Sequence, residues 1–106
     1  MAKYLIKANY AGDGITGLMN EGGTKRKAAA EAAIQSVGGT LESMYYAFGD
    51  TDVYAIGDFP DAATAAAASL LVNSTGAVSL SLTPLLTVED MDAAAAKGGS
   101  YTPPGG

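Results

Sequence analysis

The stretch Phe48-Gly49-Asp50-Thr51-Asp52-Val53-Tyr54 lies near the middle of the chain, between two runs rich in apolar and aromatic residues. A connection this short, containing Gly and Asp, predicts an antiparallel hairpin of two strands, residues 40–48 and 52–59. Strict alternation divides the first strand into two faces that both carry large apolar groups: Leu41, Ser43, Tyr45 and Ala47 against Glu42, Met44, Tyr46 and Phe48. We expect a strand of this kind to be covered on both sides.

The flanking segments add one strand and one helix on each side of the hairpin. Alternation over residues 4–10 and 77–83 predicts two more strands. Helices are predicted over residues 24–37, capped by Thr24, and over residues 62–73, capped by Asp61. The alanines of these helices are expected to let helix and sheet approach closely. A last short helix begins after Thr87 and runs to about Lys97.

Residues 11–23 contain five glycines. Each glycine inside a helix costs about 1 kcal/mol relative to Ala. Ile15, Leu18 and Met19 give the segment a weak helical stripe that would allow a helical turn or two, but a connection that merely turns is the favoured prediction.

This order of elements predicts an α+β fold of the ferredoxin-like βαββαβ kind, plus a short C-terminal helix. In that arrangement an antiparallel sheet carries its helices on one face. The other face is expected to be covered by a second subunit, a ligand, or both. We expect one domain over residues 1–97, followed by a Gly/Pro-rich tail over residues 98–106.

The composition excludes several classes of function. Of the 106 residues, 48% are hydrophobic and only 16% are charged, which indicates that a partner subunit covers part of the surface. The absence of His and Cys excludes a Ser-His-Asp triad, a thiol nucleophile and the usual zinc ligands. A net charge of −5 argues against nucleic-acid binding.

The apolar run at the N-terminus is too short for a signal peptide. No segment approaches the roughly 20 apolar residues of a membrane helix. We therefore expect a cytoplasmic protein that has no membrane partner. The sequence predicts no cofactor.

The central turn is the first candidate site. One interpretation is that Asp50 and Asp52 share a proton or hold a divalent cation with water. The favoured interpretation is turn chemistry, in which their side chains accept hydrogen bonds from nearby N–H groups. Two carboxylates without further ligands make a weak metal site, so no metal is predicted. If the fold has a ligand pocket, Tyr46, Phe48 and Tyr54 beside this turn are its expected wall.

The basic turn Lys25-Arg26-Lys27 is the second candidate site. It lies where a helix begins, so free N–H groups and positive charge together favour an anion. The alternative, which is favoured, is a solvated turn that pairs with a nearby acid such as Glu31. No nucleotide-binding glycine motif accompanies it.

Five segments together resemble the small bacterial GYD-domain family. They are Met1-Ala2-Lys3-Tyr4-Leu5, Glu21-Gly22-Gly23, the central stretch of residues 48–54, residues 69–76, and Thr83-Pro84-Leu85-Leu86-Thr87. The Gly-Tyr-Asp element that names the family corresponds here to Gly49, Thr51 and Asp52. Because Thr51 replaces the tyrosine, a role carried by that tyrosine is not transferred to this chain.

The resemblance implies a ferredoxin-like domain similar to the dimeric α+β barrel group, whose members pair their sheets face to face. It implies a fold and an assembly but no reaction. We expect a homodimer or higher homo-oligomer that binds a small ligand or a protein. The alternative is a cofactor-independent oxygenase or isomerase acting on a small aromatic or carbonyl compound. The sequence does not decide whether the protein is an enzyme.

Overall fold

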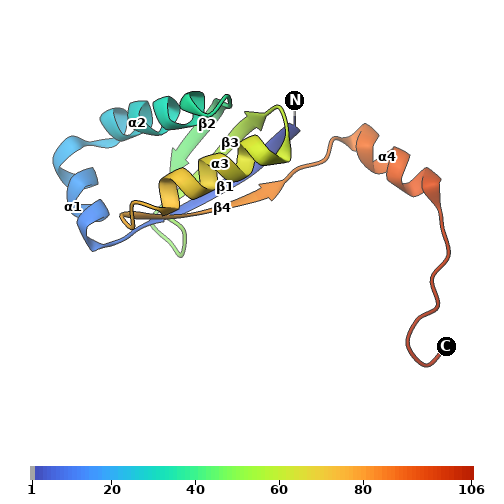
Figure 1. Cartoon of the computed structure of the whole chain (residues 1–106). Coiled ribbons are helices and arrows are strands. Elements are labelled where there is room, and N and C mark those ends of the chain that lie inside the picture. The colour runs from blue at the N-terminus through green and yellow to red at the C-terminus, as the bar shows by residue number, and fades with distance from the viewer. Residues whose placement is uncertain (1) are drawn as a thin grey trace.

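The computed structural model describes residues 2–106, so Met1, the first residue of one of the motifs quoted above, lies outside it. Eight helices and strands follow one another along these residues (Figure 1). In chain order they are β1 (Ala2–Tyr10), α1 (Gly12–Glu21), α2 (Gly23–Ser36), β2 (Thr40–Tyr46), β3 (Val53–Phe59), α3 (Ala62–Asn73), β4 (Val78–Pro84) and α4 (Val88–Lys97).

The four strands form one sheet in the order β2-β3-β1-β4, and each neighbouring pair is antiparallel. Helices α2 and α3 lie side by side on one face of this sheet (Figure 1). The strand order and the position of the helices confirm the predicted ferredoxin-like arrangement. We call the opposite face the open face, because no helix of residues 2–106 covers it (Figure 1).

The core lies between the sheet and the two helices. The inward-facing positions of β1 and β3 contribute Ile6, Ala8, Val53, Ala55 and Phe59, all buried. The Phe59 ring is completely buried and meets Tyr4 edge to face at 5.5 Å between ring centroids. It fits only because two neighbours are glycines, since a Cβ at Gly39 would lie 2.6 Å from the ring and one at Gly57 2.9 Å.

The predicted faces of β2 are wrong because the strand contains an irregularity. Leu41 pairs with Gly57 and Ser43 with Ile56, so one extra residue, Glu42, is accommodated between them. Such a β-bulge shifts the alternation by one position. Leu41 and Met44 therefore both face the core, whereas strict alternation placed them on opposite faces.

The prediction for residues 11–23 is also wrong, since most of this segment forms α1. Helix α1 packs against the start of β4, where the Ala11 N–H donates to the Ala77 carbonyl at 2.9 Å. A Cβ on Gly14 would lie 2.2 Å from the same carbonyl oxygen, so the glycine permits this close packing. Here tertiary contact outweighs the low helix propensity of glycine. Helix α2 then begins at Gly23, after Gly22 with φ 85°, and not behind a Thr24 cap.

The segment after β4 extends away from the rest of the molecule (Figure 1). We call residues 85–106 the arm; all of them are exposed, and they include α4, whose start is fixed by a capping box between Thr87 and Asp90. The arm raises the radius of gyration to 16.9 Å, whereas a compact chain of this length has a value of about 13 Å. Across the described residues, no helix combines the length and apolar character needed to cross a membrane.

Candidate functional site

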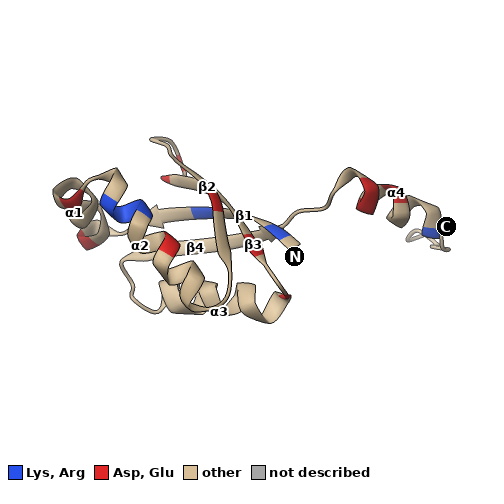
Figure 2. Ribbon diagram, turned by 90° about the horizontal axis from the view of Figure 1, so that it is seen from above, with Lys and Arg blue, Asp and Glu red and all other residues tan. Residues whose placement is uncertain are grey.

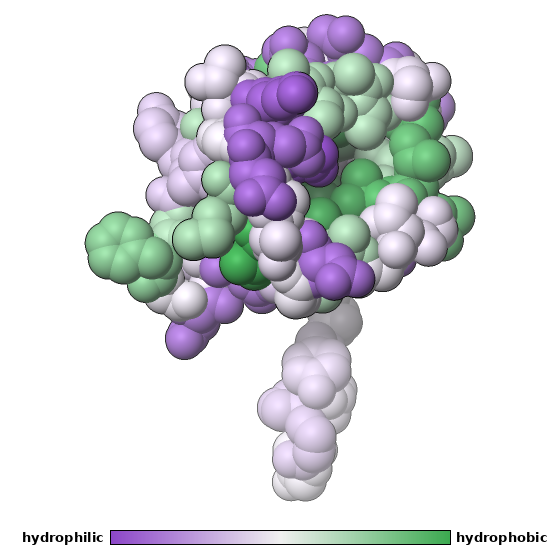
Figure 3. Space-filling model, turned by 90° about the vertical axis from the view of Figure 1, so that its left-hand side faces the viewer, coloured by the Kyte–Doolittle hydropathy of each residue, from purple (hydrophilic) through white to green (hydrophobic). Residues whose placement is uncertain are grey.

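A cavity of about 460 Å³ lies between the sheet and helices α2 and α3. Its floor is formed by the inward-facing side chains of the sheet, and its walls by small residues of α2 and by larger ones of α3. Figure 3 shows hydrophobic residues at the bottom of a hollow on this side of the molecule, with hydrophilic residues along part of its edge. The wall residues include Ala29, Ala30 and Ala33 of α2 and Leu71 and Val72 of α3.

The cavity follows from the composition of the helices. The side chain of Ala is too short to reach the sheet, and the buried residue that α2 does insert is Ile34. The alanines were expected to let helix and sheet approach closely; instead they leave apolar space between the two layers. Apolar space of this kind is suited to apolar ligands.

Polar groups gather at one side of this cavity. Arg26 and Tyr10 belong to its lining. The Tyr46 hydroxyl donates to the Gly23 carbonyl at 2.8 Å, which ties β2 to the start of α2. Burial raises the pKa of Tyr46, the neighbouring Tyr10 hydroxyl raises it further, and the Arg26 charge lowers it. Tyr46 therefore interacts electrostatically with both Tyr10 and Arg26.

The basic turn lies in the first turn of α2, next to α1 (Figure 2). Its three members differ in position: Lys25 and Lys27 are exposed, whereas Arg26 is partly buried and reaches the cavity. The acid that approaches Arg26 is Glu21 at the end of α1, with 3.7 Å between nitrogen and oxygen, and not Glu31. A pair this long and this exposed contributes little to stability.

Asp52 joins the central turn to the end of β1. Its Oδ2 accepts a hydrogen bond from the Tyr10 N–H at 2.9 Å, and its own N–H donates to Asn9 Oδ1 at 3.0 Å. Its carbonyl accepts from the Ala47 N–H at 2.7 Å. This geometry agrees with the interpretation of Asp52 as a turn residue. Asp50, two positions earlier, is exposed.

The structure brings together only part of the predicted pocket wall. Tyr46, Phe48 and Asp52 line a second hollow, of about 410 Å³, together with Ile15 and other residues near α1. Asp50 is not among its lining residues. Tyr54 lies on the open face, opposite Tyr45 of β2.

The family model described as "GYD domain" matches residues 4–95, which include the sheet, the cavity and the central turn. This chain belongs to the GYD domain family. The match runs from β1 into α4, so the GYD domain contains both the cavity and the central turn. Among curated proteins and among solved structures, no match was found.

Sequence reasoning did not find the main cavity of this GYD domain. It identified Arg26 only as one of three cations, and it placed Tyr10 only at the end of the predicted strand of residues 4–10. The available signal was the run of small residues in α2, Ala28-Ala29-Ala30, together with Ala32 and Ala33. Within residues 2–106, no group of three or more acidic side chains is placed to hold a metal ion.

Proposed function

We propose that this GYD domain protein is a binding module for a small, largely apolar molecule held between the sheet and helices α2 and α3. The observation that carries the proposal is the apolar cavity of about 460 Å³. Its volume lies within the range of about 300–1,000 Å³ typical of small-molecule sites, which combine an apolar lining with a few polar groups.

The energetics of the cavity favour occupation. Apolar walls without partner atoms forgo dispersion contacts, and each buried CH₂ group of a ligand contributes about 0.8 kcal/mol. A ligand that binds only the folded chain raises its stability by mass action. Binding is therefore expected to raise the melting temperature.

The alternative, a cofactor-independent oxygenase or isomerase, has less support. An acid–base mechanism without His would need a carboxylate or several Tyr hydroxyls facing the substrate. Among the described residues that line the cavity, Tyr10 is the one tyrosine, and none is Asp or Glu. This lining suits retention of a molecule better than its conversion.

The test uses decanol, an uncharged amphiphile, as the probe. Wild-type protein is expected to bind it in calorimetry and to melt at a higher temperature in its presence. Ala33→Leu occupies part of the cavity and should weaken binding, whereas Ala32→Leu on the exposed side of the same helix should bind as the wild type does. No melting shift in wild-type protein, or undiminished binding by Ala33→Leu, would refute the proposal.

We also propose that the working species is a homo-oligomer in which a second copy covers the open face. This face presents Tyr45, which is 71% exposed, and Tyr54, which is 41% exposed, on adjacent strands. The arm adds the exposed apolar side chains Leu86, Val88 and Met91. A monomer that exposes this much apolar surface is unusual, and such patches typically bind a partner.

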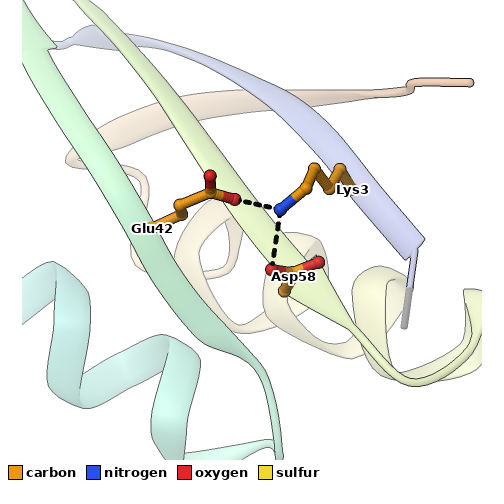
Figure 4. A network of polar contacts seen from close by, with 3 residues as sticks. All are labelled: Lys3, Glu42 and Asp58. Carbon is orange, nitrogen blue, oxygen red and sulfur yellow. Dashed lines mark hydrogen bonds and ion pairs between the residues drawn. The ribbon is translucent and has the colours of Figure 1, made fainter. Parts of the chain in front are cut away.

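The charges on the open face are compatible with coverage by a second copy. Lys3 of β1 lies between Glu42 of β2 and Asp58 of β3 and forms ion pairs with both (Figure 4). The hydrogen bonds that Lys3 donates to Glu42 and then to Asp58 raise the pKa of Lys3. Burying charges that already form ion pairs within one chain costs less free energy of desolvation than burying isolated charges.

Light scattering coupled to size-exclusion chromatography tests the assembly. A mass well above the 10.6 kDa of one chain is expected at micromolar concentration. Tyr45→Glu would place a negative charge on the open face and should lower the mass, whereas a wild-type mass of one chain would contradict the proposal.

A further inference from the structure

We propose that the ligand of the main cavity is a carboxylate amphiphile, with its anionic group at Arg26 and its apolar body between the sheet and helices α2 and α3. This inference rests on the proposed function, because it requires that the cavity holds a small molecule. It adds the chemical class of that molecule and the side that its charged end occupies.

Arg26 is the cation that the fold directs to the cavity. Three basic residues follow one another at the start of α2, and Arg26 alone of the three belongs to the cavity lining. Its side chain is 30% exposed, so the guanidinium is reachable from solvent while part of its stem is buried. An anionic group at this point remains partly hydrated while the rest of the ligand lies in apolar surroundings.

The guanidinium of Arg26 has capacity for a further anion. Its ion-pair partner Glu21 lies at 3.7 Å, beyond the range of about 2.7–2.9 Å of a charge-assisted hydrogen bond. Within residues 2–106, the Arg26 side chain takes part in none of the side-chain hydrogen bonds of the structure. A ligand carboxylate would therefore compete with Glu21 alone for the guanidinium.

Tyr10 is the tyrosine of the cavity lining, whereas the neighbouring Tyr46 lines the second hollow. The Tyr46 hydroxyl is held by its bond to the Gly23 carbonyl at 2.8 Å, one helical turn before Arg26. Tyr10 interacts with Tyr46 and belongs to the cavity lining, so it is the tyrosine that a ligand in the cavity would meet.

The charge of the lining selects a monoanion. One guanidinium balances one carboxylate, and its planar pair of N–H donors matches the two oxygens of that group. A phosphate monoester carries more than one negative charge at neutral pH and would need further cations in the lining. Lys25 and Lys27, which could supply them, are exposed on α2 and do not line the cavity.

The experiment compares decanoate with decanol by calorimetry, because the two probes share a chain and differ in charge. Arg26→Gln should weaken decanoate binding about tenfold or more, as expected for loss of hydrogen bonds between charged groups. Its affinity for decanol should fall far less, because the uncharged hydroxyl of decanol forms no ion pair with Arg26. Lys97→Gln in α4 makes the same change in net charge far along the chain from the cavity and should alter neither affinity.

Glu21→Gln provides a second, independent variant with the opposite expected sign. It removes the acid that approaches Arg26, so decanoate should bind a few-fold more tightly. This result does not depend on whether Arg26→Gln folds. Equal effects on decanoate in Arg26→Gln and Lys27→Gln, or an unchanged affinity in Glu21→Gln, would overturn the inference.

The probes also separate the two proposals. If wild-type protein binds decanol but not decanoate, the cavity is a site for neutral molecules, and the assignment of Arg26 is overturned while the proposed function stands. If it binds neither, the proposed function itself is refuted.

Discussion

Replacing Asp52 by alanine removes the carboxylate that joins the central turn to β1. The lost interaction is the hydrogen bond from the Tyr10 N–H to Oδ2, which is 2.9 Å long and partly buried. A hydrogen bond to a charged group contributes about 1.5–3 kcal/mol. We expect a loss of about 2 kcal/mol in the free energy of unfolding, and a melting temperature lower by about 8–16 °C in a domain of this size.

Two further variants show whether the hydrogen bond or the charge is responsible. Asp52→Asn keeps an oxygen acceptor for the Tyr10 N–H and should lose less stability than Asp52→Ala. Asp50→Ala removes the same charge two residues earlier, from an exposed side chain, and should change stability within about 0.5 kcal/mol.

Urea unfolding followed by circular dichroism measures all three variants under the same conditions. If Asp50→Ala and Asp52→Ala were equally destabilised, the effect would come from net charge, and the assignment of Asp52 as a structural turn residue would be refuted. If Asp52→Ala kept the stability of the wild type but lost ligand binding, Asp52 would belong to a functional site.

Two other predictions follow from close contacts at the ends of the helices. Gly14→Ala places a Cβ 2.2 Å from the Ala77 carbonyl oxygen and should lower the free energy of unfolding by about 1–3 kcal/mol. In Gly12→Ala the added Cβ enters open space, so the stability should not fall. Urea titration of both variants shows whether the loss comes from local packing or from the number of glycines. Hydrogen bonds from Thr64 lower the pKa of Asp61 in the folded chain. The ionised Asp61 therefore stabilises the fold fully above its pKa in the unfolded chain, about 4, and this stabilisation is lost as pH falls through its pKa in the folded chain. Asp61→Asn should therefore weaken the dependence of the melting temperature on pH below about pH 5, and an unchanged dependence would contradict this.

The parts of the fold that depend on local signals were predictable. The start of α3 agrees with the prediction because Asp61 accepts a hydrogen bond from the Thr64 N–H. Helix α4 also begins behind Thr87 as expected, with the N–H of Asp90 donating to the threonine hydroxyl. Capping of this kind involves residues three apart in the chain, so the sequence alone contains the information.

The parts that depend on contacts between distant segments were not predictable. The glycines of α1 have low helix propensity, and their compatibility with a helix depends on the position of Ala77 in the fold. The extra residue at Glu42 is visible only once β2 is paired with β3. The main cavity depends on how much space remains between layers, and neither periodicity nor spacing reports a volume.

The candidate site was therefore only partly foreseeable. The sequence placed Arg26 in a basic turn at the start of a helix, which is correct, but it gave no reason to separate it from Lys25 and Lys27. That separation depends on which side of α2 faces the sheet. Tyr46 and Tyr54 were expected to form one wall, yet the pairing of the strands places them on opposite faces.

The irregularity at Glu42 has a consequence for comparing this chain with its relatives. Strand β2 has one residue, Glu42, between Leu41 and Ser43, whereas their partners in β3, Gly57 and Ile56, are adjacent in sequence. A homologue without the irregularity would have to be aligned with a one-residue gap opposite Glu42. If the gap were placed after β2 instead, the alignment would shift by one residue at Tyr45 and Tyr46. It would then match Tyr45, which lies on the open face, with a position that contacts α2, the position that Tyr46 occupies here.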